Sequence, residues 1–491
     1  MPLCSGRIRA VEELILAVTK GIWRVQLSHA ARLKGARFDD PSLVSAGGLV
    51  PVLGLADRVG LCRLVDGQLT VPTDKGAHAG AKVAALVAGM VAGADSIEDM
   101  GLLRHGGMGR LFTGTYAPST LGSFLRGFAF GHVRQLDAVA ARLVANLAAQ
   151  APVLPGAGEV AYLDVDDTVR ATYGYAKQGA GYGYCGVKGL NALLAVLSTP
   201  SAAPVIVATR LRKGSTNSAR GAARLVADAL KTSHGCGASG LLIVRADSAF
   251  YGRDVIAAIG RAGARFSVTA RQDPAVRRAI ASISEDAWTT IRYPRAVWDE
   301  QLGQWVSDAQ IAEIEFTAFA SRGSRQAVTA RLIVRRVRDA NPDHVIANEQ
   351  GQLFPAWRHH AVFTDSPLTL IQAEADHRRH AIIEQVIADL KNGPLAHLPS
   401  GRFNANGAWL ILAAMAFNLT RAAGALASRF HATATTATIR RQLINVPARP
   451  VRSARRLHLR LPANWPWAAD WLDLFTAAFT AAVGPPTAAT A

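Results

Sequence analysis

The chain has 491 residues, is 50% hydrophobic, and carries 54 Lys and Arg against 36 Asp and Glu, a net charge of +18. That length allows two or three domains around a large core, and the basic balance favours a polyanionic partner such as nucleic acid. Its four cysteines are far apart and form no CxxC pair, which argues against a zinc finger or a disulfide framework and fits a reducing cytoplasm. Because the sequence contains neither a run of about eighteen apolar residues nor an intact export signal, we expect no membrane association.

The first part of the chain predicts helices. Residues 1–40 are a basic N-terminal extension that could be a DNA-touching arm, although a solvated helix is the simpler interpretation. In residues 41–151 apolar side chains recur every three or four positions, which indicates a helical domain. Its arginines suit DNA binding, and a plain helical packing domain is an equally good interpretation. The prolines and glycines of residues 152–158 predict a linker.

Three acids follow a predicted strand. Residues 160–165 are apolar and rich in strand formers, and this strand is expected to end at Asp164, Asp166 and Asp167. Period two would place Asp164 and Asp166 on one face and Asp167 on the other. Clustered carboxylates need a counter-charge, and hard divalent cations prefer oxygen ligands of this kind. For an isolated DxDDT string, a turn or cap at Asp167 is the alternative.

A Gly- and Tyr-rich tract comes next, at residues 173–186. It predicts a loop that can approach a phosphate backbone closely, with Lys177 and Lys188 as candidate DNA contacts. Two further strands and a helix lead to a second buried strand at residues 241–245, just before Asp247. Strand-end acids in an α/β sheet are where metals and ligands are often held, while a helix N-cap is the alternative for Asp247.

The region between Asp247 and the next acid of interest is predicted to be rich in strands. Expected strands lie at residues 266–270, 289–293, 311–320, 327–337 and 360–364, with a hairpin around residues 321–324. Several tryptophans, Trp298 among them, occur in this region. Such aromatics are more often core residues, yet a β-rich insert beside an active site could hold an unpaired base.

A strongly helical stretch covers residues 373–391. Its polar residues His377, His380, Glu384 and Lys391 fall along one stripe, where Glu384 could enter a shared site with a cation alongside. Plain surface charges are the alternative for Glu384 and Lys391. The histidines lack the HExxH spacing of a zinc helix, so zinc is not expected.

These motifs together resemble a family. The DDT string at Asp166, the DSAFY string at Asp247, and Glu384 followed by Lys391 look like the DDE transposases of bacterial insertion sequences. The tract TYGYAKQGAGYGYCGVKG is especially similar to the thirteen-eighty group. The resemblance extends from about Arg37 to the WPW string at residues 465–467. It implies an α/β fold with an RNase H-like catalytic domain (residues 159–270 and 359–430) interrupted by a β-rich insertion (residues 271–358), and a basic C-terminal segment (residues 431–491).

The resemblance also implies a chemistry. Two divalent cations, Mg²⁺ or Mn²⁺, would be held by Asp166, Asp247 and Glu384, roughly 3.5 to 4 Å apart. DNA at the element's end would be hydrolysed, and the freed 3′-hydroxyl would attack target DNA, with a hairpin end as a candidate intermediate.

Related enzymes carry a Tyr, Arg, Glu, Lys signature on the last helix, and His377 and His380 occupy its first two places here. Arg378 and Arg379 are therefore candidate phosphate contacts beside Lys391. The family usually begins near VQLSHAARLKGARF, so residues before about Val25 are expected to be an upstream extension.

The sequence thus predicts a cut-and-paste transposase that binds the terminal inverted repeats of its own element and target DNA. We expect a homodimer in the synaptic complex, in the cytoplasm of a bacterium and associated with the nucleoid. An end-binding repressor without catalysis would bind the same ends uncut. An unrelated metal-dependent phosphoesterase would show little DNA affinity. A Thr-rich linker is expected at residues 431–438, followed by arginines that form either a solvated tail or a DNA contact.

Overall fold

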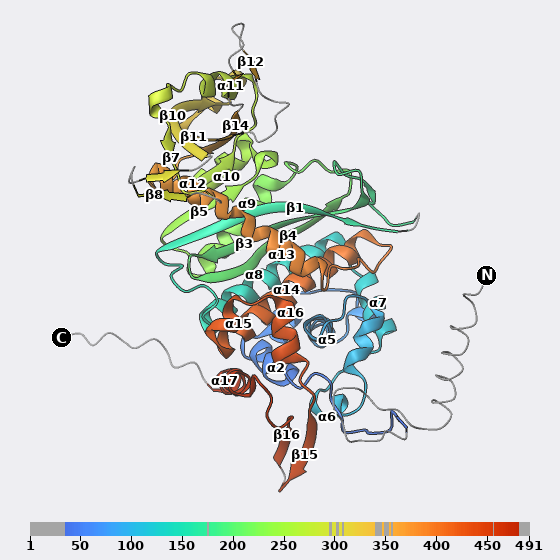
Figure 1. Cartoon of the computed structure of the whole chain (residues 1–491). Helices are drawn as coiled ribbons and strands as arrows, with labels where there is room; N and C mark the ends of the chain where they lie inside the picture. Colours follow the sequence, from blue (N-terminus) through green and yellow to red (C-terminus); the bar gives the residue numbers. More distant parts are fainter. Residues whose placement is uncertain are drawn as a thin grey trace, which may run out of the picture.

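The computed structural model describes residues 35–480, except 174–175, 294–296, 301–303, 307–308, 339–345, 348–352, 355–356 and 455 (Figure 1). The predicted N-terminal arm therefore lies outside the described residues up to position 34. Residues 35–40, the described remainder of that arm, form neither helix nor strand.

The part of the chain before the first strand is helical, as its apolar periodicity predicts. The helices are α2 (Leu49–Arg58), α3 (Leu61–Asp66), α4 (Thr73–Gly76), α5 (Ala79–Ala92), α6 (Met108–Leu111), α7 (Pro118–Arg126) and α8 (Phe130–Gln150), with the 3-10 turn η1 (Glu98–Leu103). Pro118 is the first residue of α7. A backbone N–H at this position has no acceptor within the helix, so the N–H that proline lacks costs no helical hydrogen bond. Bends and turns over residues 151–159 connect α8 to the sheet.

A mixed sheet forms the centre of the molecule. Its main strands are β1 (Val160–Ala171), β3 (Lys188–Thr199), β4 (Ala202–Lys213), β5 (Leu241–Ala246) and β6 (Arg265–Thr269), in the spatial order β4-β3-β1-β5-β6. Neighbours among β1, β3 and β4 are antiparallel, whereas β5 and β6 continue parallel to β1. The short β2 (Gly181–Tyr182) pairs with the start of β3.

Strand β1 is longer than the sequence predicts. It does not end after residue 165, because β3 pairs with it continuously from Tyr162 to Ala171. Thr168 and Val169 are β-branched residues that suit this extension. The three clustered acids therefore lie inside a strand and do not follow its end.

The segment between β6 and β14 (Trp357–Thr364) widens the sheet at one edge, at the top of Figure 1. β14 pairs with β6, and β11 (Val328–Arg338), β10 (Ala309–Ala318) and β7 (Thr289–Thr290) follow in antiparallel order. The predicted hairpin joins β10 to β11 through η4 (Ala320–Arg322) and η5 (Ser324–Gln326). The remaining elements are α11 (Pro274–Ala281), η3 (Glu285–Ala287), β8 (Val297–Asp299) with β9 (Gln304–Val306), and β12 (Ile346–Ala347) with β13 (Leu353–Phe354).

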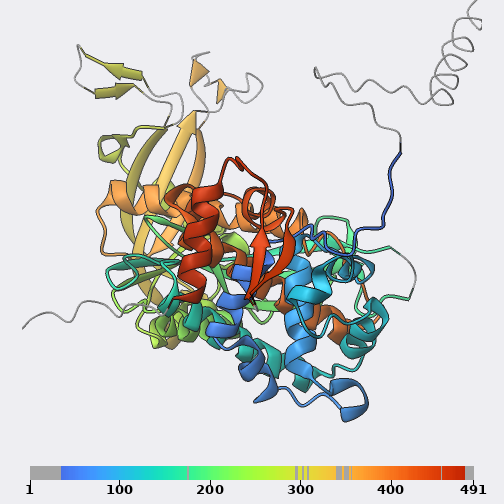
Figure 2. The same ribbon diagram turned by 90° about the horizontal axis from the view of Figure 1, so that it is seen from below.

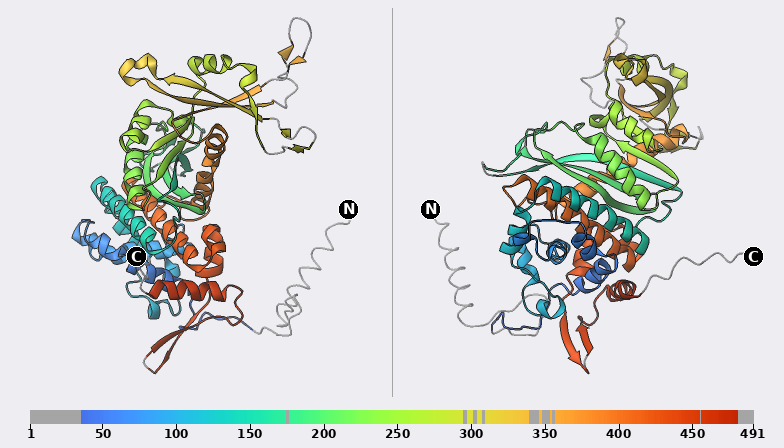
Figure 3. Two further views of the ribbon diagram at one scale, coloured as in Figure 1. Left: turned by 90° about the vertical axis from the view of Figure 1, so that its left-hand side faces the viewer. Right: turned by 180° about the vertical axis from the view of Figure 1, so that it is seen from behind.

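Helices cover both faces of the sheet, as the side view in Figure 3 shows. On one face, α9 (Ala222–Gly235) connects β4 to β5, α10 (Arg253–Arg261) connects β5 to β6, and the 3-10 turn η2 (Ser248–Phe250) precedes α10. On the other face lie α12 (Leu370–Arg378) and α13 (Ile382–Lys391). The single helix predicted over residues 373–391 is wrong, because the 3-10 turn η7 (Arg379–Ala381) separates these two helices.

The C-terminal part folds back onto the helical block. α14 (Phe403–Ala427) contacts α5, α8, α17 and β4. The linker predicted at residues 431–438 is wrong: α15 (Arg429–Thr433) and α16 (Thr436–Ile439) occupy it. Ser428 and Thr435 accept hydrogen bonds from the backbone N–H groups of His431 and Thr438, so these hydroxyls are helix N-caps. The π-helical turn η8 (Arg440–Ile444), β15 (Arg449–Ser453), β16 (Arg456–Arg460) and α17 (Ala468–Phe479) follow.

One hydrophobic cluster includes residues of the N-terminal helices, the sheet and the C-terminal helices. Helix α14 lies at its centre, and seen from below in Figure 2 the N-terminal and C-terminal helices pack side by side. In the described part of the chain, α14 is the one helix long and apolar enough to cross a bilayer, and 89% of its most apolar window is buried inside the protein. That burial fits a core helix.

Candidate active site

Asp164 is neutralised by a buried arginine. It is fully buried in β1 and accepts two hydrogen bonds from the Arg245 guanidinium, both at 2.7 Å. Arg245 lies on β5, directly opposite Asp164 in the parallel register, and its Nη1 also donates to the carbonyl of Asp376 at 2.6 Å. His380 Nδ1 lies 2.9 Å from Asp164 Oδ1. This bidentate pair holds the end of α12 and the turn η7 against β1.

Asp167 has its own arginine on the opposite face. Its carboxylate forms an ion pair with Arg212 of β4 and accepts a hydrogen bond from Asn191 Nδ2 at 3.1 Å. Arg212 also donates to the carbonyls of Ser218 at 2.7 Å and Arg220 at 2.8 Å, ahead of α9. The strand period therefore places Asp164 and Asp167 on different faces, as predicted, and Asp167 is not a turn or cap.

Asp166 and Asp247 lie side by side. Val165 is opposite Ala246 in the parallel pair β1–β5, so the next residues are Asp166, within β1, and Asp247, directly after the end of β5. Strands in a sheet are about 4.8 Å apart, which brings the two side chains together at one edge. Asp247 is also an N-cap, since its Oδ1 accepts from the N–H of Ala249 at 2.9 Å. The predicted alternative was an N-cap of the helix that follows, but Asp247 caps the 3-10 turn η2, and Gly252 is the N-cap residue of α10.

Burial makes the ionised forms of both carboxylates less favourable. Burial raises the pKa of Asp166 to about 6, and the neighbouring Asp247 carboxylate adds to the rise. Burial also raises the pKa of Asp247. Within the described residues, the ion pairs of this region go to Asp164 and Asp167, and none goes to Asp166 or Asp247. Their hydrogen bonds come from backbone N–H groups, including that of Asp167 at 2.7 Å to Asp166.

Glu384 stands apart from the two aspartates. It is exposed on α13, about one turn beyond His380. Across the described ranges, no group of three or more His, Cys, Asp or Glu side chains is placed to hold a metal ion. The structure thus brings Asp166 and Asp247 together and leaves Glu384 outside their group.

Glu384 instead lines a cavity of about 260 Å³ between the α12–α13 segment and strands β6, β11 and β14. His377 and His380 line it too, so these three residues of the predicted stripe share one space, and Lys391 is not among its lining residues. His377 is hydrogen-bonded to Ser267 and Thr269, and burial lowers its pKa to about 3. It is therefore a neutral ring at physiological pH. The same wall holds Glu374, whose carboxylate pairs with Arg335 and Arg378.

A family model for the transposase DDE domain group 1 matches residues 29–481, nearly the whole chain. The chain belongs to the DDE transposase family. No curated protein matches the chain in a sequence comparison. Members of the family are nucleases that act on DNA, and they generally use divalent metal ions.

The residues predicted to contact DNA are dispersed over the transposase. Arg379 is largely exposed and bonds Asp376 at 2.7 Å, while Arg378 bonds Glu374 at 2.9 Å. Lys177 donates a hydrogen bond to the carbonyl of Leu398. Lys188 begins β3, opposite Tyr182, and Lys391 ends α13. Trp298 is in β8, but its side chain lies outside the described residues.

Sequence reasoning missed three residues of the site. The sequence does not indicate that Arg245 pairs with Asp164 or Arg212 with Asp167. Each arginine follows its acid by many residues and contacts it only because their strands are close in the sheet. Tyr184 was noticed only as part of the Gly- and Tyr-rich tract. It lies at the tip of the β2–β3 hairpin with 79% of its surface exposed, and its pKa is raised by partial burial and by the carboxylates of Asp167 and Asp166.

The site suits a divalent cation at the aspartate pair. Two adjacent carboxylates whose pKa values are raised by burial would be stabilised by a counter-charge, and Mg²⁺ needs only one or two carboxylates together with waters and phosphate oxygens. Asp164 and Asp167 are already satisfied by arginine and are poor candidates. Asp166 and Asp247 are therefore the residues that would hold the ion.

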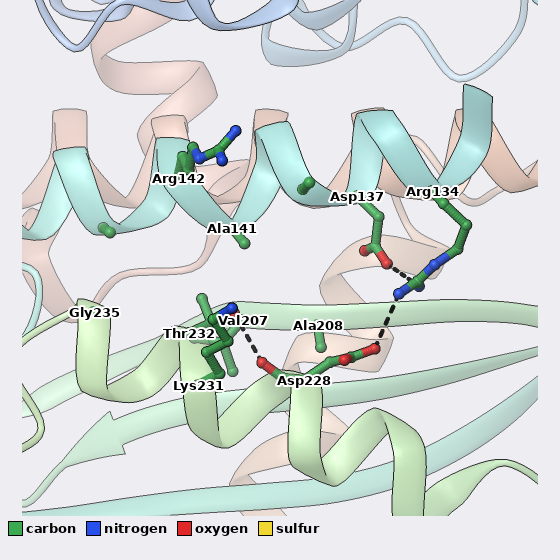
Figure 4. A pocket seen from close by; sticks show the side chains of 12 residues that line it. Arg134, Asp137, Ala141, Arg142, Val207, Ala208, Asp228, Lys231, Thr232 and Gly235 are labelled. Atoms are coloured by element: carbon green, nitrogen blue, oxygen red, sulfur yellow. Dashed lines mark hydrogen bonds and ion pairs between the residues drawn. The ribbon is translucent and has the colours of Figure 1, made fainter. Parts of the chain in front are cut away.

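A second cavity, of about 360 Å³, lies between α8 and α9 above β4, and none of the three predicted acids lines it (Figure 4). One end is closed by Arg134, which bonds Asp228 at 3.2 Å and also pairs with Asp137. Alanines of α8 form much of its wall. The Arg134–Asp228 pair joins α8 to α9, so it stabilises the contact between the helical block and the helix that covers this face of the sheet.

Proposed function

We propose that this chain is the transposase of a bacterial insertion sequence of the thirteen-eighty group. In this proposal it binds the terminal inverted repeats of its element, cuts there and joins the freed end to target DNA. The observation that carries the proposal is the contrast among the acids of the sheet: Asp164 and Asp167 are paired with arginines, while Asp166 and Asp247 sit side by side without one.

An RNase H-like catalytic domain is part of the proposal. It is supported by the strand order β4-β3-β1-β5-β6, with the first three strands antiparallel and the last two parallel to β1. The strands added between β6 and β14 occupy the place of the predicted β-rich insertion, residues 271–358. We propose residues 41–151 as a helical DNA-binding region and residues 431–491 as a basic C-terminal segment.

The chemistry is a displacement at phosphorus. In the first step a water oxygen bonds to the phosphorus at the element's end, the bond to the 3′-oxygen breaks, and a proton reaches that oxygen. In the second step the 3′-hydroxyl oxygen loses its proton and bonds to a phosphorus of the target DNA. The bond from that phosphorus to the 3′-oxygen of the target strand breaks, and this oxygen leaves and takes up a proton. A divalent cation, Mg²⁺ or Mn²⁺, would supply charge stabilisation and activation of the attacking oxygen when bound.

The residues of this chain have separate parts in that scheme. Asp166 and Asp247 would bind the cation, and Glu384 would complete its ligands or those of a second ion once α13 and DNA come together. Arg245 and His380 position β1 against η7 through Asp164, so they act on the site indirectly. Arg379 and Lys391 would contact phosphates without reading sequence. A homodimer would bring two ends together.

Metal-dependent cleavage of a labelled duplex carrying the element's own end tests the proposal. We expect the wild-type protein to cut with Mg²⁺ or Mn²⁺, Asp166→Asn and Glu384→Gln to bind without cutting, and Asp164→Asn to be weakened but active. An exposed-acid variant outside the proposed DNA-binding region, Asp254→Asn on α10, should cut at the wild-type rate. Equal loss in Asp164→Asn and Asp166→Asn would contradict the assignment of the cation-binding acid.

An end-binding repressor is the second candidate. It is favoured by one observation, the separation of the exposed Glu384 from the aspartate pair. If the wild-type protein binds the ends and cuts with neither metal, the repressor function takes precedence.

A further inference from the structure

A two-stranded hairpin projects from the end of the molecule opposite the widened sheet. β15 and β16 pair in antiparallel register from Arg449 opposite Arg460 to Ser453 opposite Arg456. Figures 1 and 3 show this hairpin extending beyond the helical block. Its base is fixed by backbone pairing of Val44 with Ala448 and by a hydrogen bond from the Gly47 N–H to the carbonyl of Val446 at 2.8 Å.

The register separates the side chains of the hairpin into two faces. Opposite residues of an antiparallel pair share a face, and alternate residues along each strand do so too. One face carries Pro450, Arg452, Leu457 and Leu459, and the leucine nearest the base, Leu459, packs against the hydrophobic core. The other face carries Arg449, Val451, Ser453, Arg456, His458 and Arg460. We name this second set the basic face.

The basic face has little internal neutralisation. Its basic residues are exposed, and the sequence of the hairpin contains no acid. Within the described residues, the one ion pair of this face joins Arg449 to Asp40 at 2.9 Å. Arg449 and Arg460 stand directly opposite each other, an arrangement that destabilises an isolated pair of strands. A polyanionic partner would relieve that repulsion.

We propose that the basic face of the β15–β16 hairpin binds duplex DNA, an inference that rests on the proposed function and adds a DNA-contacting element to it. A two-stranded ribbon has the dimensions that the major groove admits. Same-face residues recur every ~6.8 Å along a strand, and Arg456, His458 and Arg460 are spaced in this way along β16. The basic face therefore offers a regular row of basic side chains to the phosphates of a DNA backbone.

Duplex binding as a function of salt tests the proposal. The perturbed protein is Arg456→Gln/Arg460→Gln, and the charge-matched control is Arg261→Gln/Arg278→Gln, two exposed arginines on α10 and α11. Fluorescence anisotropy of a labelled duplex is measured from about 0.05 to 0.3 M NaCl, and losing two phosphate contacts should lower the slope of log K against log salt by about 1.8. At about 0.15 M salt the same loss corresponds to binding on the order of 30-fold weaker. The control should keep the wild-type slope.

The other outcomes separate this inference from the proposed function. A hairpin variant that binds duplex with the wild-type affinity and salt slope would overturn the inference. The proposed transposase function would still stand if the wild-type protein cuts the ends and binds duplex with a steep salt slope. A hairpin variant that binds duplex normally but elutes as a smaller oligomer in size-exclusion chromatography would assign the hairpin to contacts between copies of the chain. If the wild-type protein binds duplex without a steep salt slope and does not cut the ends, both proposals fail. Circular dichroism spectra that overlay for all three proteins exclude misfolding as the cause of lost binding.

Discussion

Neutralising Asp166 should stabilise the protein in the absence of divalent cations. Burial and the Asp247 carboxylate raise the pKa of Asp166 from 3.8 to about 6. Ionised Asp166 therefore lowers the free energy of unfolding. One pKa unit is about 1.36 kcal/mol, which makes that reduction about 3 kcal/mol at pH 8. Asp166→Asn removes it. For a chain of this length, unfolding entropy of ~2.1 cal/mol/K per residue converts this to an increase in Tm of about 3 °C.

The pH dependence gives the sign of the effect. Because the folded-state pKa is raised, the wild-type protein gains stability as pH falls through the window from 6 to 3.8. The advantage of Asp166→Asn should therefore shrink from about 3 kcal/mol at pH 8 to about 1 kcal/mol at pH 4.5. Differential scanning fluorimetry with chelator at these pH values measures it, with exposed Asp57→Asn as the control, expected within about 0.5 kcal/mol of wild type.

Added MgCl₂ supplies the second half of this experiment. A cation bound by Asp166 and Asp247 raises the Tm of the wild-type protein, because a ligand that binds only the folded state stabilises it. Asp166→Asn should respond much less. A variant that melts at or below the wild-type temperature at pH 8 in chelator would refute the account of Asp166 as a partly buried carboxylate without an ion-pair partner in the described residues.

Two further substitutions test contacts that support the site. Arg245→Met should destabilise the protein by about 3 to 5 kcal/mol in urea unfolding, because it leaves the fully buried Asp164 carboxylate without its arginine and with His380 as its remaining side-chain contact; adding Asp164→Asn should recover much of the loss, and additive effects would contradict a direct pair. Asn418→Leu should cost at least about 2 kcal/mol, since the Asn418 amide donates to the Ile206 carbonyl at 2.7 Å and accepts from its N–H at 2.8 Å within the core; a Tm equal to that of wild type would show that these backbone groups find other partners.

The sequence predicts the sheet well where local pattern and strand pairing agree. β3, β4, β5 and β6 contain or overlap the stretches of β-branched and apolar residues that predicted them. It failed at β1, where pairing with β3 carries the strand past the acids to Ala171. It failed again at residues 431–438, because Ser and Thr are frequent both in linkers and at helix N-caps, and only the packing of α15 and α16 against α14 distinguishes the two.

The acids show why the candidate site was only partly predictable. Four aspartates, three in β1 and one directly after β5, have similar sequence surroundings. The alternation of side chains along a strand predicts which face each one lies on, but it does not predict which of them has a basic partner. This depends on Arg212 of β4 and Arg245 of β5, which reach Asp167 and Asp164 only through the order of strands in the sheet. Once those two charges are neutralised, Asp166 and Asp247 are left as adjacent carboxylates for which the described residues show no ion pair. We therefore propose that a divalent cation would be held there, and that Glu384 would join it through a movement of α13 or through DNA.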